Sequence, residues 1–216
     1  MSRQEIARRI NSIGGDVHRL TQDIAALQSA NTANNLDYYY GLSQQAALQA
    51  ENIALRLRRL VYDSTSQPKA AYLAGAACKL GIIAYESNGI VEITLPCLIP
   101  KRSKKAMAFI TDPLLVALDT FISGRQPPFK LFTNCVICIT HVYDKTLPTT
   151  GRVRDHDNIE LKGIIDAVNT YLLTDDSGIL CNIYSASELG SNDMTHISIM
   201  DKGMFPAWIL RHQNTP

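Results

Sequence analysis

The residues of this sequence best suited to chemistry are two pairs of aspartates on either side of a short helical pattern. Asp155 and Asp157 belong to the run 154–158, and Asp175 and Asp176 begin eighteen residues after Asp157. Residues i and i+2 of an extended segment point to the same side, and one helix would return the chain to the same sheet edge. Neighbouring carboxylates repel one another unless a cation lies between them. The pattern therefore predicts a Mg²⁺ site with Asp155, Asp157, Asp175 and Asp176 as ligands.

A metal ion held in this way can activate a water molecule against a phosphodiester. Lys162 falls one turn into the expected helix, where it would neutralise charge developing on the phosphate. Basic residues near the site are expected to contact a nucleic-acid backbone. They are Lys101, Arg102, Lys104, Lys105, Arg152 and Arg154.

Each of these residues also has a purely structural interpretation. Asp157-Asn158 can provide a helix N-cap, and Asp175-Asp176 can be a solvated turn. Lys162 can be an exposed helix charge paired with Asp166. His156 alternates away from its two aspartate neighbours in an extended segment, so it is expected not to bind the metal.

The motifs together resemble the RusA family of Holliday junction resolvases. They are Arg154-Asp155-His156-Asp157-Asn158, Lys162, Asp166-Ala167-Val168-Asn169 and Asp175-Asp176-Ser177, with Leu95-Pro96 and the basic loop from Pro100 to Lys104 upstream. The resemblance covers about residues 89–200 and leaves the helical residues 1–80 outside. It implies a homodimeric α/β fold and Mg²⁺- or Mn²⁺-dependent cleavage of branched DNA in recombination and repair. It also implies catalytic roles for Asp155, Asp157, Asp176 and Lys162, with Asp175 beside them, and suggests a mobile-element origin.

One spacing departs from that family. Its members usually have two residues between the asparagine and the lysine, whereas Ile159, Glu160 and Leu161 make three here. Because the distance from Lys162 to Asp166 is kept, the extra residue is expected in the turn before the helix. The insertion can rotate Lys162 away from the metal pocket by about 100°. Catalytic competence is therefore a separate question from fold.

The composition is that of an ordinary globular protein. Hydrophobic residues make up 46%, charged residues 19%, and the net charge is +1, so any nucleic-acid surface must be local. Five scattered cysteines form no disulfide framework, which favours a reducing cytoplasm. Cys135 and Cys138 lie in an apolar run and should face opposite sides of a strand as buried thiols. The segment 70–85 is too short to span a bilayer, so no membrane partner is expected.

The first 65 residues are expected to form an αα-hairpin. Seven apolar residues alternate four and three positions apart, as in a heptad seam: Ile6, Ile10, Ile13, Val17, Leu20, Ile24 and Leu27. Gly14-Gly15 interrupts this pattern without shifting its phase, which favours one continuous helix. A second helix is expected over 36–62, with Leu57 on its apolar face and Arg56, Arg58 and Arg59 on its polar side. The hairpin either packs on itself or the neighbouring domain, or binds a partner or a second copy through residues 1–62.

The remainder is expected to be a small domain over 81–210, after a linker with a short helix over 66–80. Asn88-Gly89 between β-rich runs predicts a hairpin, and Asp112-Pro113 predicts a helix start. Phe132 to Val142 reads as a central strand and 159–171 as a helix, followed by strands over 178–184 and 194–200. The whole chain is therefore predicted to be α+β, with the helical hairpin preceding a mixed sheet flanked by helices.

Three functions fit these features. The first is a Mg²⁺-dependent endonuclease that resolves branched DNA as a homodimer, because symmetric incisions need symmetric sites. The second is a non-catalytic DNA- or protein-binding protein on a RusA-like fold, acting through the helical hairpin. The third is a coiled-coil assembly factor, for which the heptads over 6–27 are the only evidence.

Overall fold

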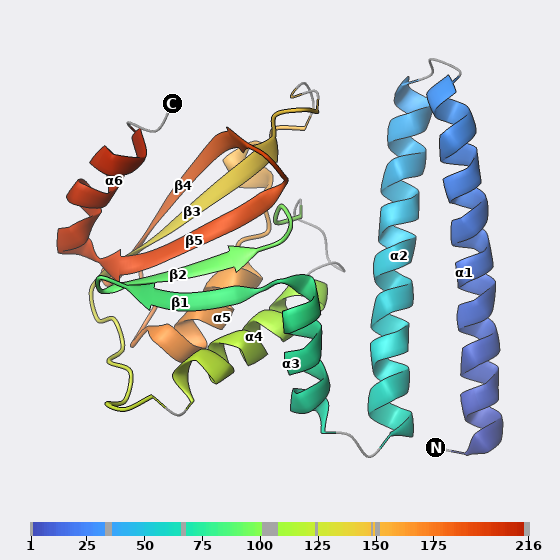
Figure 1. The fold of residues 1–216 in the computed structure, drawn as a ribbon, viewed down its shortest axis with the longest axis horizontal. Helices are drawn as coiled ribbons and strands as arrows, with labels where there is room; N and C mark the ends of the chain where they lie inside the picture. The colour runs from blue at the N-terminus through green and yellow to red at the C-terminus, as the bar shows by residue number, and fades with distance from the viewer. Residues whose placement is uncertain are drawn as a thin grey trace. The chain divides into compact units, whose positions relative to one another are not determined.

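The computed structural model describes residues 2–32, 36–65, 68–100, 108–123, 125–147, 149 and 152–213. The chain forms two compact units, Met1–Tyr72 and Leu73–Pro216, and the division lies inside the expected linker. Figure 1 labels the helices and strands of both units. The α+β class predicted from the sequence is confirmed.

The first unit is an antiparallel helical hairpin of α1 (Arg3–Thr32) and α2 (Leu36–Ser64). As predicted, α1 continues through Gly14-Gly15 without a break. The two helices are joined by contacts between residues far apart in sequence. The Arg56 guanidinium donates to Ser12 Oγ at 2.7 Å and pairs with Asp16, and Gln49 Nε2 donates to the Asp16 carbonyl at 3.1 Å. Arg56 therefore lies in the interface between the two helices. The sequence pattern had instead placed it on the polar side of α2.

The hairpin buries only half of the expected seam. Ile13 is buried at the interface, and Ile6, Leu20 and Leu27 are half-buried. The other interface positions of α1 are polar: Arg9 pairs with Asp63, and Asp16 with Arg56. Ile10, Val17 and Ile24 are 50%, 45% and 47% exposed, and Leu57 is 44% exposed, so the hairpin does not cover its own apolar face at these four positions. The alternative, in which this face binds a partner or a second copy, stays a prediction. Alternating spacings of four and three fix a stripe on the helix, but not which edge of it the partner helix covers.

The helix α3 (Lys69–Leu80) spans the division between the units. At its start, Tyr72 contacts the Tyr62 ring edge-on, with centroids 5.5 Å apart. Near its end, Ala77 belongs to the main core of the second unit.

The second unit is built on a five-stranded mixed sheet in the order β1-β2-β5-β3-β4. The strands are β1 (Ile83–Ser87), β2 (Ile90–Leu95), β3 (Cys135–Asp144), β4 (Cys181–Gly190) and β5 (Met194–Asp201). Only β3 and β4 pair in parallel. The predicted β1–β2 hairpin is present, with Asn88 at φ 53° and Gly89 at φ 76° in the left-handed region that an Asn-Gly turn requires.

Helices cover both faces of this sheet (Figure 1). On one face, α4 (Ala108–Ile122) and α5 (Lys162–Leu172) pack against Ile137, Ile139 and Ile197. On the other, α6 (Phe205–Gln213) follows the short turn η2 (Lys202–Met204) and packs Trp208 on Val136, Cys138 and Met200. Cys135 belongs to the first core and Cys138 to the second, so the opposite facing of these two buried thiols is confirmed.

Two predicted helix starts were wrong. α4 contains Pro113 and extends back to Ala108, so Asp112 is not its N-cap. The burial of Ile110 in the core favours the extra turn despite the proline. α5 begins at Lys162 and not at Ile159, because Ile159 is extended and buried in the core. The helix α6 had no counterpart among the predicted elements.

Candidate functional site

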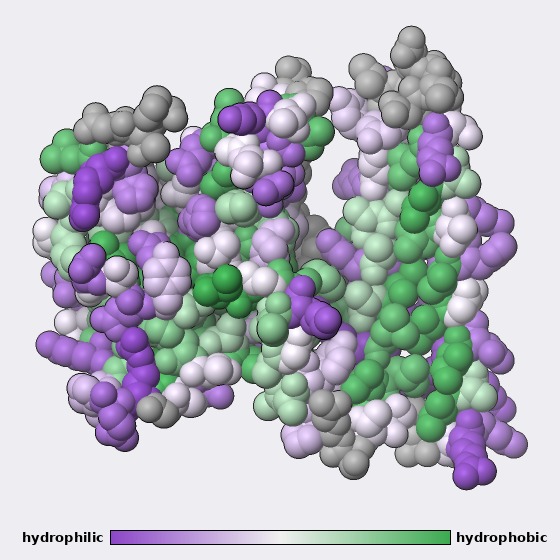
Figure 2. All heavy atoms as spheres, in the orientation of Figure 1, coloured by the Kyte–Doolittle hydropathy of each residue, from purple (hydrophilic) through white to green (hydrophobic). Residues whose placement is uncertain are grey.

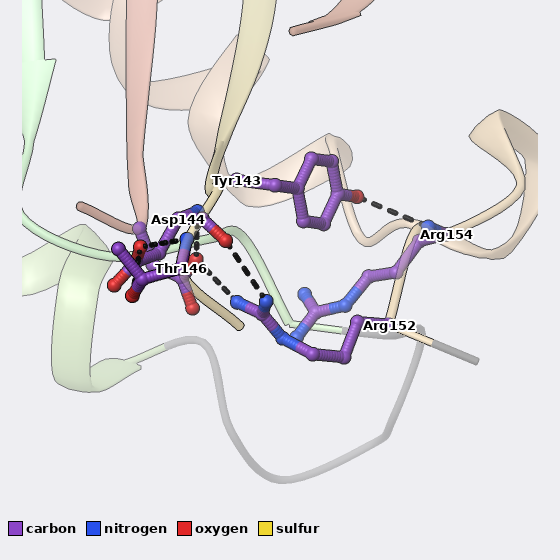
Figure 3. Close-up of polar contacts among 6 residues, drawn as sticks. Tyr143, Asp144, Thr146, Arg152 and Arg154 are labelled. Carbon is purple, nitrogen blue, oxygen red and sulfur yellow. Dashed lines mark hydrogen bonds and ion pairs between the residues drawn. The ribbon is translucent and has the colours of Figure 1, made fainter. Parts of the chain in front are cut away.

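The segment that carries Asp155 and Asp157 leaves the end of β3 through a network of polar contacts (Figure 3). Asp144 closes the strand: its Oδ1 accepts hydrogen bonds from the Thr146 N–H at 2.8 Å and hydroxyl at 2.7 Å. These bonds, with the charge of Arg152, lower the pKa of Asp144. The Arg152 guanidinium reaches Asp193 Oδ1 at 2.6 Å and the Asp144 carbonyl at 3.3 Å. Arg152 thus ties the end of β3 to the turn between β4 and β5.

Arg154 is held in a similar way. Its backbone N–H donates to the Tyr143 hydroxyl at 3.0 Å (Figure 3), and its guanidinium donates to the Ile99 carbonyl. Tyr143 is almost fully buried. The two arginines that were expected to contact DNA therefore bond to groups of the protein itself.

The aspartates of the run do not share one extended segment. Asp155 is extended, at φ −66° and ψ 138°, but His156–Asn158 forms the single 3₁₀ turn η1. The prediction that Asp155 and Asp157 point to the same side by strand alternation was therefore wrong in its premise. Both residues are exposed, and neither caps α5, which begins after Leu161 with no side-chain cap.

The ring of His156, although exposed, contacts the sheet. Its Nδ1 lies 2.6 Å from Ser185 Oγ on β4, and its ring centroid lies 6.4 Å from that of His141 on β3. His141 is only 1% exposed, and its Nε2 has no hydrogen-bond partner among the described residues. Burial, followed by the nearby His156 and Arg154, lowers the pKa of His141 to about 4. The sequence signal for this contact was the position of His156 within the Asp-His-Asp run, but only the 3₁₀ turn directs the ring inward.

The extra residue before Lys162 lies outside the helix, as expected. Ile159 is buried in the core, and the Glu160 N–H donates to the Pro100 carbonyl at 3.1 Å. These contacts place the insertion in the connection between η1 and α5. The position of Lys162 at the start of α5 follows from them.

Lys162 is paired with a carboxylate on its own helix. Its Nζ lies 2.8 Å and 3.1 Å from the two oxygens of Asp166, and the side chains are 77% and 52% exposed. This is the exposed helix pair considered as the structural alternative. Asp166 is the main cause of the raised pKa of Lys162, and Asp176 and Glu160 act in the same direction. Lys162 therefore lies within electrostatic range of carboxylates from three segments.

Asp175 and Asp176 lie in the exposed connection from α5 to β4. Asp175 Oδ1 accepts the Ser177 N–H at 3.2 Å, and the Ser177 carbonyl accepts the N–H groups of Leu180 and Cys181 at 2.9 Å and 2.8 Å. The segment is thus a solvated turn, and the Asp176 carboxylate is one of the charges that raise the pKa of Lys162.

The described part of the chain contains no group of three or more His, Cys, Asp or Glu side chains that could hold a metal ion. Asp155, Asp157, Asp175 and Asp176 are thus not drawn into one cluster, although Asp176 and Lys162 interact electrostatically. Lys101, Arg102, Lys104 and Lys105 lie outside the described residues. Among the described residues of the predicted site, Lys162 contacts Asp166 and interacts electrostatically with Asp176, and the acidic set is not gathered.

Comparison with known proteins identifies the family. The profile of a family of unknown function, DUF6100, matches residues 2–216. The chain belongs to this family. No curated protein matches it. Among solved structures, the periplasmic domain of Helicobacter pylori MotB (residues 90–256) is 12% identical with a TM-score of 0.34, over 63% of this chain and 91% of that one.

Among the described residues, no helix of this DUF6100 member is long and apolar enough to cross a membrane.

Proposed function

We propose that the second unit is a divalent-metal-dependent endonuclease acting on branched DNA, as the resemblance to RusA resolvases implies. The observation that carries the proposal is the position of Lys162. Its Nζ lies 2.8 Å from Asp166, and Asp166, followed by Asp176 of the second acidic pair and by Glu160, raises the pKa of Lys162. A lysine beside acidic metal ligands can stabilise charge that develops on a phosphate.

The donor chemistry of the acidic residues fits Mg²⁺ or Mn²⁺. Asp155, Asp157, Asp175 and Asp176 are exposed and offer the hard oxygen ligands that these ions prefer. A bound ion would offset the repulsion among them and supply an activated water. In the described arrangement these four aspartates are not clustered. The proposal therefore requires that the segments before and after α5 move toward each other when the ion binds.

The anchoring of the acidic run supports the same proposal. Arg154 is bonded to Tyr143 and Ile99, and His156 to Ser185, so the backbone on both sides of Asp155 is fixed to the sheet. A catalytic carboxylate needs such support from surrounding residues. Arg154 and His156 would be positioning residues, and DNA contacts would fall to the basic residues Lys101, Arg102, Lys104 and Lys105. The protein would act as a homodimer in the cytoplasm, consistent with its free cysteines.

The proposal is tested by incubating the protein with a labelled four-way junction or linear duplex, in Mg²⁺ or EDTA. Asp157→Asn and Lys162→Met should each reduce junction cutting by about 100-fold or more, since each removes a group acting in the transition state. Asp119→Asn changes an exposed aspartate on α4 and is the matched control. Metal-dependent cutting by the protein and the control, lost in both site variants, supports the assignment. Absence of cutting in any metal, or equal cutting by Asp157→Asn, refutes it.

A second function is favoured by a different observation. Arg152 and Arg154 are engaged in contacts within the fold, and Lys162 pairs with Asp166. This is the pattern expected if the acidic site no longer acts and the protein binds DNA or another protein without cutting. Junction binding without cutting, with the same affinity in Asp157→Asn, would favour this binding function over the nuclease.

A further inference from the structure

One side of the helical hairpin is apolar and open. Ile10, Val17 and Ile24 recur every seven residues along α1 and are 50%, 45% and 47% exposed. They lie beside the interface with α2 and not within it, because Arg9, Asp16 and Asp23 occupy the adjacent interface positions. Figure 2 shows apolar atoms running along this hairpin for most of its length.

The second helix contributes to the same side. Leu57 follows Arg56, which contacts Ser12 and Asp16 across the interface, as Ile10 follows Arg9, which pairs with Asp63. In two antiparallel right-handed helices, the residues that follow such facing positions lie on one common side of the pair. Leu57, 44% exposed, and the exposed Ala50 therefore extend the α1 stripe across α2. We call this surface, made of Ile10, Val17, Ile24, Ala50 and Leu57, the apolar side.

Between Gln4 and Gln28 the apolar side carries no charge on α1; Arg3, one heptad before Ile10, lies at its end. The positions next to its three large residues are small or uncharged: Ala7, Asn11, Gly14, His18, Thr21 and Ala25. The charged residues of α1 between Gln4 and Gln28 lie at the interface with α2 or on the opposite flank. Arg9 pairs with Asp63 across the interface, and Arg19 pairs with Asp16 on the same helix. At the interface, the Gln45 amide on α2 reaches Asp23 at 3.4 Å, and on the opposite flank α2 presents Leu48, 47% exposed, which precedes the interface residue Gln49. The charges of α1 between Gln4 and Gln28 thus lie at the interface or on the opposite flank, and none lies on the apolar side.

We propose that two copies of this chain associate through the apolar side, so that their hairpins form a four-helix bundle. In a two-fold interface the same patch faces itself, and a charged patch would place like charges together. An uncharged patch carries no such penalty. Heptad spacing of the exposed residues is the pattern that packs helices of neighbouring chains.

The available area is sufficient for a stable dimer. From Gln4 to Gln28 the helix rises about 37 Å, and two packed helices are about 18 Å across. The side thus offers roughly 700 Å² per copy, and standard interfaces bury roughly 600–1,000 Å² per partner. The inference goes beyond the nuclease proposal and does not depend on it, since it concerns only the first unit.

The test is the molar mass of the full chain in solution, measured by sedimentation equilibrium across the micromolar range. We expect twice the 23.9 kDa of one chain. Val17→Glu should weaken the dimer by at least about 100-fold, because it places charge at the centre of the apolar side. Since glutamate favours helix more than valine, the circular dichroism of the hairpin should be unchanged. Gln22→Glu adds the same charge at an exposed position away from the apolar side and should leave the dimer intact.

A mixing experiment makes the test independent of folding. Val17→Lys should also be monomeric, and because Val17 is central in the stripe, mixing it with Val17→Glu should restore a heterodimer through opposite charges. A monomeric parent protein would overturn the proposal, as would a dimer unaffected by Val17→Glu or equally disrupted by Gln22→Glu. Failure of the two charged variants to associate would also count against a self-facing interface.

Discussion

The buried His141 should make the second unit lose stability in mild acid. A histidine of the unfolded chain binds its proton near pH 6.5, whereas burial, with His156 and Arg154, lowers the pKa of folded His141 to about 4. Between these values the unfolded chain binds more protons than the folded one. Stability from this residue is therefore intact above about pH 6.5, falls as the pH is lowered, and is fully lost below about pH 4.

The size of the effect follows from the same pKa. Each pH unit inside the interval changes the free energy of unfolding by up to about 1.4 kcal/mol for one proton. Because His141 is 1% exposed, solvent screening is small, and the loss from about pH 7 to about pH 4.5 should be roughly 2–3 kcal/mol. Carboxylates also titrate in this range. The quantity to compare is therefore the difference in the free energy of unfolding between the protein and a variant that lacks His141.

The assay is urea unfolding followed by the fluorescence of Trp208, the only tryptophan of the chain, which is buried on α6 and so reports on the second unit. His141→Leu should remove the additional pH dependence, whereas His196→Gln on β5 should retain it. A difference in unfolding free energy between the protein and His141→Leu that stays constant from about pH 7 to about pH 4.5 would refute the reasoning.

Three further predictions concern the second unit. Tyr143→Phe removes the acceptor of the Arg154 N–H and should lower the free energy of unfolding by about 1 kcal/mol in urea titrations. Tyr85→Phe changes an exposed ring and should leave that free energy unchanged. Equal losses in the two variants would contradict a stabilising role for the hydrogen bond. Gly190→Ala would place its Cβ against the Val142 side chain and should cost about 1–3 kcal/mol; Gly178→Ala, with open space around it, is the control in the same titration. Burial raises the pKa of Cys135 and of Cys138 to about 12. A thiol reagent near neutral pH should therefore modify the exposed Cys78 first, as read by mass spectrometry. Rapid modification of Cys138 in folded protein would contradict this order and show that β3 opens.

The arginines beside the acidic run have a structural role. Arg152 and Arg154 hold the end of β3 and the acidic run by contacts to Asp193, Ile99 and Tyr143. Because a half-buried arginine can satisfy several acceptors at once, both residues can hold the connection between β3 and α5 in place.

The sequence by itself determined the kinds of elements and much of their order. The unbroken α1, the Asn88-Gly89 hairpin and the buried strand β3 all follow from local rules: residue periodicity, a left-handed turn and a continuous apolar run. These rules depend on backbone geometry within a few residues, which the sequence states directly. The two aspartate pairs were also recognised from the sequence, and the structure places Asp155 and Asp157 before α5 and Asp175 and Asp176 after it.

Only the tertiary structure decided which side chains meet. The inward turn of His156 toward Ser185, the capture of Arg152 by Asp193 and the open position of Val17 each depend on residues distant in sequence or on another helix. A 3.5-residue repeat defines a stripe about one helix, but the choice of the covered edge depends on the pairing of Asp16 with Arg56. Likewise, strand alternation did not reveal the contact of His156 with Ser185, because His156–Asn158 forms a 3₁₀ turn. The connection after this turn is held by the buried Ile159 and by the hydrogen bond from the Glu160 N–H to the Pro100 carbonyl.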